Sequence, residues 1–257
     1  MEHLFGTEWA GVLAFAFAVA FCAGVVKGIV GFAMPMVMIS GLSSVMPPDV
    51  ALAGLILPTL VTNLWQALRQ GIRAALGSLR RFRVFLIAGF VFMIAGAQLV
   101  PVLSSGAMLL ILGVPVTAYG AISLAGHSPR LPPNPGPRTE AGIGAVSGFL
   151  GGISGIWGPT TVAMLTALQT EKREQMRIQG VIYGMGAIVL TMAHVGSGVL
   201  HWQAAGFSTL LIPAALLGLG LGFALQDRID QVMFRRLTLA VLVISGLNLV
   251  RRGLVSL

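Results

Sequence analysis

Charged residues are scarce in this chain. Only 9% of its 257 residues are Asp, Glu, Lys or Arg, whereas roughly 25% are charged in soluble domains. Its mean hydropathy is +0.91, and several apolar stretches exceed the ~20 residues that cross a bilayer as a helix. The shortage of charge therefore excludes an ordinary soluble domain. It predicts an all-α polytopic membrane protein.

Other absences narrow the function. A lone Cys22 excludes an internal disulfide and offers no metal cluster. There is no Walker sequence, so we expect no ATP hydrolysis by this chain, and no cofactor or metal. Glu2 and Glu8 precede the first apolar run without a basic segment, which is not the pattern of a cleaved signal peptide.

The basic residues are distributed as in a membrane protein. The net charge is +8, but the arginines cluster in short loops between apolar stretches. This is the positive-inside pattern of cytoplasmic loops. We therefore expect a lipid bilayer, and not nucleic acid, as the surrounding partner.

A proline-rich segment at 128–137 divides the chain, because proline prevents continuation of a helix. We predict a first transmembrane repeat at 1–126, a cytoplasmic linker at 127–138 and a second repeat at 139–257. The apolar segments expected in the first repeat are 9–26 with 35–44, 50–68, 82–103 and 107–124. Those of the second are 141–150 with 160–169, 176–195, 204–225 and 232–250.

The two repeats match in sequence. A shift of 124 residues superposes three glycines and a proline within twelve residues, placing Gly24, Gly28, Gly31 and Pro35 on Gly148, Gly152, Gly155 and Pro159. With a small gap the shift becomes 126, and Gly96 and Gly120 fall on Gly222 and Gly246. Internal repeats of this kind are typical of secondary transporters.

Loop charge indicates that the repeats are inverted. The arginine-rich loop at 69–83 corresponds to 196–203, which has no Lys or Arg, and the uncharged 101–106 corresponds to the arginine-containing 227–236. Opposite charge at equivalent loops predicts opposite orientation. Each repeat is then a broken re-entrant helical hairpin followed by three transmembrane helices. Only Arg251 and Arg252 disagree with this topology.

Lys27 is the only charge between Glu8 and Asp49. A cation inside an apolar span costs several kcal/mol unless it is paired or solvated, which makes it a candidate functional residue. The alternative is a lysine that snorkels to the interface from a helix end. The surrounding glycines and Pro35 indicate a broken helix, which membranes tolerate where the backbone lines a cavity or is buried in protein.

The breaks favour an anion site. Pro35 and Pro159 are suited to the first turn of a half-helix, and the free N–H groups of that turn attract anions. We predict that a small anion binds near the midplane between the two half-helix N-termini. Lys27 supplies charge from one repeat only, because Gly151 occupies the equivalent place.

Further polar residues lie within the apolar segments. Ser and Thr in membrane helices more often bond to backbone than to ligand, and a histidine there is either a packing residue or a proton carrier. The complete set of candidate binding residues is Lys27, Gly28, Gly31, Pro35, Asn63, Gln66, Gly152, Ser154, Gly155, Trp157, Pro159, Thr160, Thr161, Gln179 and His194.

The run Gly24-Val-Val-Lys-Gly-Ile-Val-Gly-Phe-Ala-Met-Pro35 and the run Gly148-Phe-Leu-Gly-Gly-Ile-Ser-Gly-Ile-Trp-Gly-Pro159 resemble those of the sulfite exporter TauE/SafE family, also called the 4-toluene sulfonate uptake permease family. The resemblance implies a multi-pass carrier of the bacterial inner membrane, and not an enzyme. It implies export of sulfite, sulfoacetate or related organosulfonate anions. Many members have a purely glycine-rich first motif, and this chain departs from them at Lys27 and Phe32. A homodimer is an open alternative to a monomer.

Two other functions are compatible with the residues. A glycine-lined pore with Lys27 is also compatible with an anion channel. Gly152-Ile-Ser154-Gly155 with His194 resembles the serine and histidine of an intramembrane protease. The same glycine spacing recurs at Gly28–Gly31 without serine, so the repeat explains the motif without a nucleophile.

Overall fold

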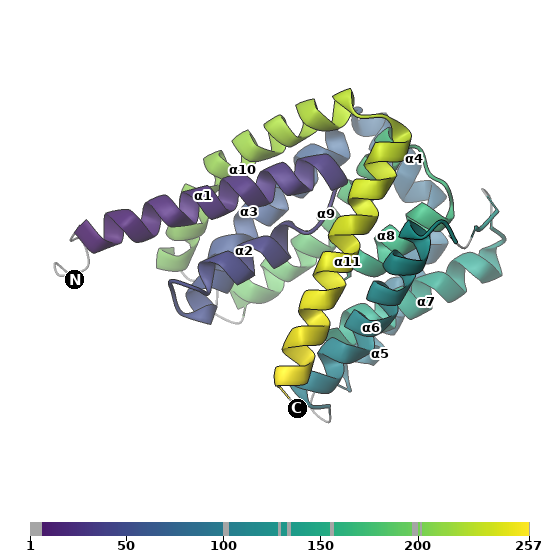
Figure 1. Ribbon diagram of the computed structural model, residues 1–257, viewed down its shortest axis with the longest axis horizontal. Helices are drawn as coiled ribbons and strands as arrows, with labels where there is room; N and C mark the ends of the chain where they lie inside the picture. The colour runs from purple at the N-terminus through teal and green to yellow at the C-terminus, as the bar shows by residue number, and fades with distance from the viewer. Residues whose placement is uncertain are drawn as a thin grey trace. The chain divides into compact units, whose positions relative to one another are not determined.

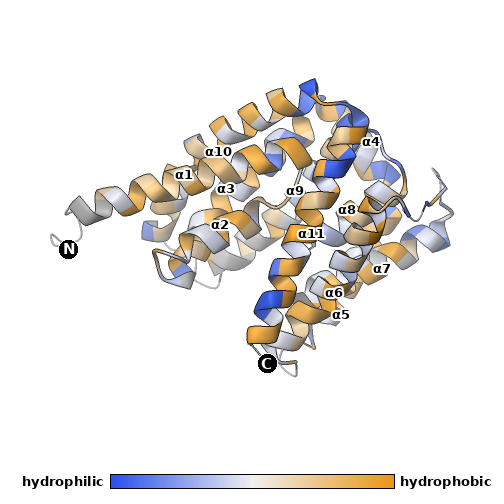
Figure 2. Cartoon of the chain, in the orientation of Figure 1, coloured by the Kyte–Doolittle hydropathy of each residue, from blue (hydrophilic) through white to orange (hydrophobic). Residues whose placement is uncertain are grey.

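The chain is entirely helical in the part that its computed structural model describes, which comprises residues 7–99, 103–127, 130–132, 135–154, 157–196, 200 and 202–256. Eleven helices and no strand occur in these ranges, which confirms the all-α prediction (Figure 1). Five helices are long and apolar enough to cross a membrane: Ala10–Val30, Asp49–Leu68, Gly106–Leu124, Trp202–Arg228 and Gln231–Val255. Figure 2 shows hydrophobic residues along these helices and hydrophilic ones mainly near helix ends.

The helices form two compact units, and each unit combines helices of both sequence repeats. Unit 1 is Met1–Arg69 with Tyr183–Ile229, and unit 2 is Gln70–Ile182 with Asp230–Leu257. Unit 1 holds α1 (Thr7–Val30), α2 (Met34–Leu42), α3 (Pro48–Leu68), α10 (Trp202–Arg228) and the second part of α9 (Lys172–Gly196). Unit 2 holds the first part of α9, α4 (Ile72–Arg81), α5 (Arg83–Ala97), α6 (Ser105–Leu124), α7 (Pro137–Ser154), α8 (Gly158–Ala167) and α11 (Gln231–Val255).

In unit 1, α1 and α3 both run parallel to α10. A Cβ at Gly24 would lie 2.3 Å from the Ala215 carbonyl oxygen, and one at Gly28 would lie 2.6 Å from Gly222 Cα. Along α3, Leu57 N bonds to Ser208 Oγ at 3.1 Å, and the Arg69–Asp227 ion pair closes the last turns of α3 and α10 at 2.6 Å. These residue pairings show that α1 and α3 begin beside the same end of α10.

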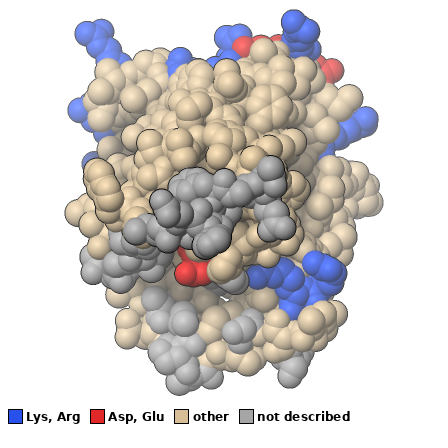
Figure 3. Space-filling view, turned by 90° about the vertical axis from the view of Figure 1, so that its left-hand side faces the viewer, with Lys and Arg blue, Asp and Glu red and all other residues tan. Residues whose placement is uncertain are grey.

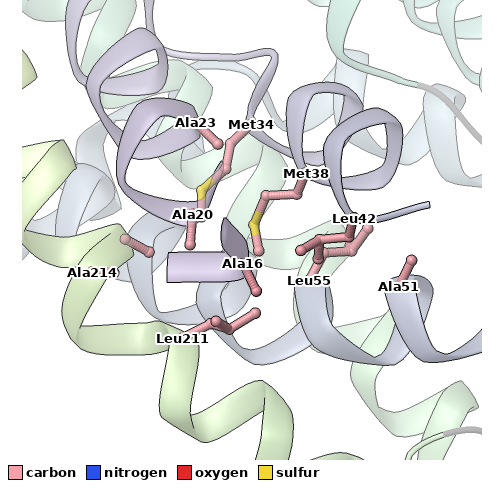
Figure 4. Packing of buried hydrophobic residues seen from close by; sticks show 11 residues of the cluster. Ala16, Ala20, Ala23, Met34, Met38, Leu42, Ala51, Leu55, Leu211 and Ala214 are labelled. Atoms are coloured by element: carbon pink, nitrogen blue, oxygen red, sulfur yellow. The ribbon is translucent and has the colours of Figure 1, made fainter. Parts of the chain in front are cut away.

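Small residues let these helices approach closely, and methionines fill the remaining space. Figure 4 shows the Met34 and Met38 side chains of α2 extending toward the alanines of α1. Both methionines and Ala16 and Ala20 are fully buried. Unbranched methionine adapts to irregular gaps, so α2 can fold back along α1 despite its nine residues.

A proline inside α3 is compensated by α10. Pro58 has no N–H, so the Gly54 carbonyl loses its usual partner one turn later. The fully buried Ser208 hydroxyl donates to that carbonyl at 3.1 Å. The Ser208 hydroxyl oxygen also accepts a hydrogen bond from Leu57 N, and the two bonds fix the register of α3 against α10.

In unit 2, α7 runs parallel to α5, and α11 runs antiparallel to α6. A Cβ at Gly148 would lie 2.0 Å from the Gly89 carbonyl oxygen, so the α5 and α7 backbones touch. The end of α8 returns to the linker that precedes α7, because Leu131 N donates to the Ala167 carbonyl at 2.9 Å. The α7–α8 hairpin therefore enters and leaves unit 2 at one end.

The close contacts of the glycines repeat between the two halves of the sequence. The contacts between α1 and α10 have equivalents between α7 and α5. Adding 124 to a residue of α1 gives its equivalent in α7, and subtracting 126 from a residue of α10 gives its equivalent in α5. Gly24 with Ala215 corresponds to Gly148 with Gly89, and Gly222 with Val25 corresponds to Gly96 with Phe149. Gly120 with Val243 corresponds to Gly246 with Thr117, within the antiparallel α6–α11 pair. An inverted repeat would place equivalent helices antiparallel in this way, and the inversion itself stays a prediction.

Element bounds differ from the prediction at several places, and α7 begins at Pro137, inside the predicted linker. The arginine-rich stretch expected as a loop contains α4, whose buried face is formed by Ala75 and Ser78. Apolar positions spaced three or four apart among the arginines were the signal of this helix. α5 ends at Ala97, earlier than the predicted 103. On the face drawn in Figure 3, uncharged residues cover most of the surface and Lys and Arg form separate groups.

Candidate functional site

The break between α1 and α2 requires two left-handed residues. Gly31 has φ 89° and Ala33 has φ 72°, and α2 starts directly after them with Pro35 in its first turn. Alanine pays a steric penalty in this conformation, so surrounding contacts must hold it. Gln66 Nε2 supplies one of them by donating to the Gly31 carbonyl at 3.1 Å. The first turn of α2 has no side-chain cap, which leaves its N–H groups available.

Lys27 lies in the last turn of α1 and is only 2% exposed. Its ammonium donates to the Asn63 Oδ1 atom. Asn63 is held in turn, because its Nδ2 donates to the Tyr183 carbonyl at 3.3 Å. Within the described residues of unit 1, no carboxylate lies within ion-pair distance of Lys27. The buried cation is therefore held by a neutral amide and has no counter-charge there.

The glycines beside Lys27 serve helix packing. A Cβ at Gly28 would collide with the backbone of α10, so glycine is required there for the α1–α10 contact. Thr62, one residue before Asn63, is fully buried and donates to the Pro58 carbonyl at 2.6 Å. Lys27, Asn63 and Gln66, all predicted from the sequence, therefore come together around the break.

The second break lies between α7 and α8 in unit 2. Trp157 precedes α8, and Pro159 lies in its first turn. The hydroxyls of Thr160 and Thr161 both bond to the Trp157 carbonyl, at 3.1 and 3.2 Å. Ser147 accepts from Trp157 Nε1 at 3.0 Å and lies 2.6 Å from Thr160 Oγ1. The two threonines thus stabilise the start of α8 itself.

Trp157 fills the place that corresponds to Lys27. Its ring lies 3.4 Å from where a Cβ of Gly151 would stand, and Gly151 is the repeat equivalent of Lys27. The indole stacks on Phe85 with centroids 6.4 Å apart and meets the Phe90 ring edge to face at 5.3 Å. One break therefore carries a buried cation and the other a partly buried aromatic ring.

The remaining candidate binding residues have no specific contact at either break among the described residues. Gln179 of α9 is fully buried, and neither polar atom of its side chain has a hydrogen-bond partner among the described residues. Gly152 lies in the last turn of α7. Gly155 lies outside the described residues, as do the side chains of Ser154 and His194.

Two groups at these breaks were not predicted. The Tyr183 carbonyl orients Asn63, and Ser147 joins Trp157 to Thr160. No sequence signal identifies a backbone carbonyl of a continuous helix. In the sequence, Ser147 is a single hydroxyl residue within an apolar run, which is only a weak signal of a functional role.

Five helices apolar enough to cross a membrane, with two breaks at Gly and Pro and a buried lysine at one of them, define a multi-pass membrane protein. The family model described as sulfite exporter TauE/SafE matches residues 16–249, and the chain belongs to that family. It is therefore a membrane transporter of anions of the sulfite type, and not an enzyme. No curated protein and no solved structure matches the chain.

Proposed function

We propose that this protein is a secondary-active exporter of sulfite or organosulfonate anions in the bacterial inner membrane, with Lys27 as the residue that binds the anion. The buried Lys27 ammonium, with a neutral amide as its partner, is the observation that carries the proposal. A bound anion supplies the missing counter-charge.

The energetics favour this role. A buried ammonium without a counter-charge costs several kcal/mol. A snorkelling lysine reaches polar surroundings, but Lys27 is 2% exposed. Since the anion must reach a buried residue, the helices around Lys27 have to move between loading and release. That requirement suits a carrier with alternating access better than an open channel.

The chemistry of the break suits a sulfur oxyanion. Sulfite and sulfonate carry three oxygens that accept several hydrogen bonds at once. The Lys27 ammonium has three donors, and the uncapped first turn of α2 offers backbone N–H groups. We propose the same N–H donor role for the start of α8, where Pro159 occupies the first turn. Gln179, whose amide has no partner among the described residues, is the further donor that we propose in unit 2.

Export is the direction that the membrane potential favours. An inside-negative potential contributes about 2.3 kcal/mol per elementary charge per 100 mV toward expelling an anion. Few acidic groups lie within the apolar helices, so we propose that the anion gradient and the potential drive export. His194 is the residue that we propose for any proton coupling.

Flux measurements test the proposal. Proteoliposomes loaded with sulfite should release it through the protein with saturation, and an imposed potential, negative on the loaded side, should accelerate release. Lys27→Ala should abolish this flux, whereas Lys172→Ala, which removes the other lysine of the chain at the start of α9, should retain it. Non-saturating flux with large unitary conductance would identify a channel. Undiminished flux in Lys27→Ala would overturn the role of Lys27.

A further inference from the structure

Unit 2 contains an arginine-lined cavity that the transport proposal does not use. The cavity measures about 590 Å³ and is lined by Arg80 and Arg81 of α4, Arg83 and Val84 of α5, and Pro135, Pro137 and Glu140 around the start of α7. It lies where the linker meets the α4–α5 corner. A hollow with three guanidinium groups and one carboxylate is suited to an anion.

The carboxylate neutralises only one of these arginines. Arg81 Nη1 lies 3.2 Å from Glu140 Oε1, and the Glu140 side chain is 7% exposed. Arg80 and Arg83 are both exposed and have no ion-pair partner in the part of the chain that the structure describes. Two guanidinium groups therefore remain for a ligand, and guanidinium binds phosphate oxygens in a bidentate manner.

The surface beyond the cavity is apolar. Ile87, Val91 and Ile94 follow Arg83 along one face of α5 at helical spacing, and they are 65%, 58% and 66% exposed. On α4, which carries Arg80 and Arg81 in its last turn, the Ile72 side chain is also 65% exposed. An amphipathic α4 with this distribution is typical of a helix that lies at the membrane interface. The arginine-lined cavity and the apolar stripe therefore adjoin along α5, at Arg83.

We propose that this cavity binds the phosphate headgroup of an anionic phospholipid, whose acyl chain lies along the Ile87–Val91–Ile94 stripe of α5. The arginines account for a phosphate group. The stripe, which continues from Arg83 on the same helix face, favours a lipid over free phosphate.

The test compares lipid binding by charge-matched variants. The purified protein is mixed with detergent micelles that contain phosphatidylglycerol or phosphatidylcholine, and bound lipids are counted by native mass spectrometry. Arg80→Gln with Arg83→Gln should weaken phosphatidylglycerol binding about twenty-five-fold, because each arginine near a headgroup contributes roughly fivefold. Arg251→Gln with Arg252→Gln, which removes the same charge from the end of α11, should not weaken it.

A variant that is expected to strengthen lipid binding controls for misfolding, because a misfolded protein would not bind the lipid more tightly. Glu140→Gln removes the one carboxylate among the described residues that line the cavity, and it should strengthen phosphatidylglycerol binding. Ile87→Asn should weaken it and leave binding of inorganic phosphate unchanged. Equal retention of phosphatidylglycerol by the two arginine double variants would overturn the proposal. Inorganic phosphate that displaces the lipid and binds more tightly than it does would identify a free-anion site instead.

Discussion

At the scale of single residues, the proposed anion site depends on one buried cation and the amide beside it. Lys27 bonds to Asn63, and Asn63 is fixed by the Tyr183 carbonyl. The amide orients the ammonium without neutralising it. The positive charge is thereby kept for a ligand.

Asn63→Asp tests that reading. The new carboxylate would sit against Lys27 with nearly unchanged shape and would supply the counter-charge internally. We expect sulfite affinity to fall at least about tenfold, which is about 1.4 kcal/mol, while the thermal unfolding temperature does not fall. Isothermal titration and thermal unfolding of the purified variant measure both.

Asn248→Asp makes the same chemical change on α11 and is the matched control. It should leave sulfite affinity at the wild-type value. Wild-type affinity in Asn63→Asp would show that Asn63 does not face the anion.

At the scale of helices, the sequence predicted the breaks but not the contacts that hold them. Glycine and proline mark both ends of each break, so Pro35 and Pro159 were placed correctly at half-helix starts. Thr160 and Thr161 were candidate binding residues, and their hydroxyls bond to the Trp157 carbonyl, a contact that the sequence did not predict. Local pattern predicts where a helix starts. Which acceptor a hydroxyl reaches depends on the backbone geometry of the break.

Ser208 of α10 compensates Pro58 of α3, so the two residues should be energetically coupled. Ser208→Ala leaves the buried Gly54 carbonyl unpaired and should cost about 1–3 kcal/mol. In a Pro58→Ala background residue 58 regains an N–H for that carbonyl, so the same change should cost much less. Denaturant unfolding in detergent measures this double-mutant cycle. Equal costs in both backgrounds would contradict the compensation.

Close backbone packing of α7 on α5 requires Gly148. A methyl group there would lie 2.0 Å from the Gly89 carbonyl oxygen, so Gly148→Ala should separate the helices and cost about 1–3 kcal/mol. Gly142→Ala on the same helix meets nothing within 4 Å. It should be neutral or stabilise the helix by about 0.5–1 kcal/mol. Unfolding of the two variants under identical conditions makes the comparison, and equal stability would refute the contact.

At the scale of the whole chain, the all-helical class followed from composition, because so little charge leaves few alternatives. The sequence did not predict that each compact unit combines helices of both repeats. A repeat predicts equivalent helices, but it does not predict which helices pack together. The parallel course of α1 and α3 along α10 supports a first hairpin that returns to its side of entry.

Single cysteines test this topology in a Cys22→Ala background. Ser44→Cys and Gln203→Cys should react with a membrane-impermeant thiol reagent from outside the cell. Gly77→Cys on α4 should react only after permeabilisation, because the arginines around it indicate the cytoplasmic side. Labelling of Ser44→Cys and Gly77→Cys from one side would contradict the inverted hairpins.

The most direct test of the central claim is equilibrium binding of sulfite to the wild-type protein and to Lys27→Ala, with Lys172→Ala as the control. Lys27→Ala should fold and purify normally but lose at least about tenfold in affinity, since a hydrogen bond to a charged group contributes about 1.5–3 kcal/mol. Lys172→Ala should bind as the wild type does. Unchanged sulfite affinity in a folded Lys27→Ala protein would contradict the claim that Lys27 binds the transported anion.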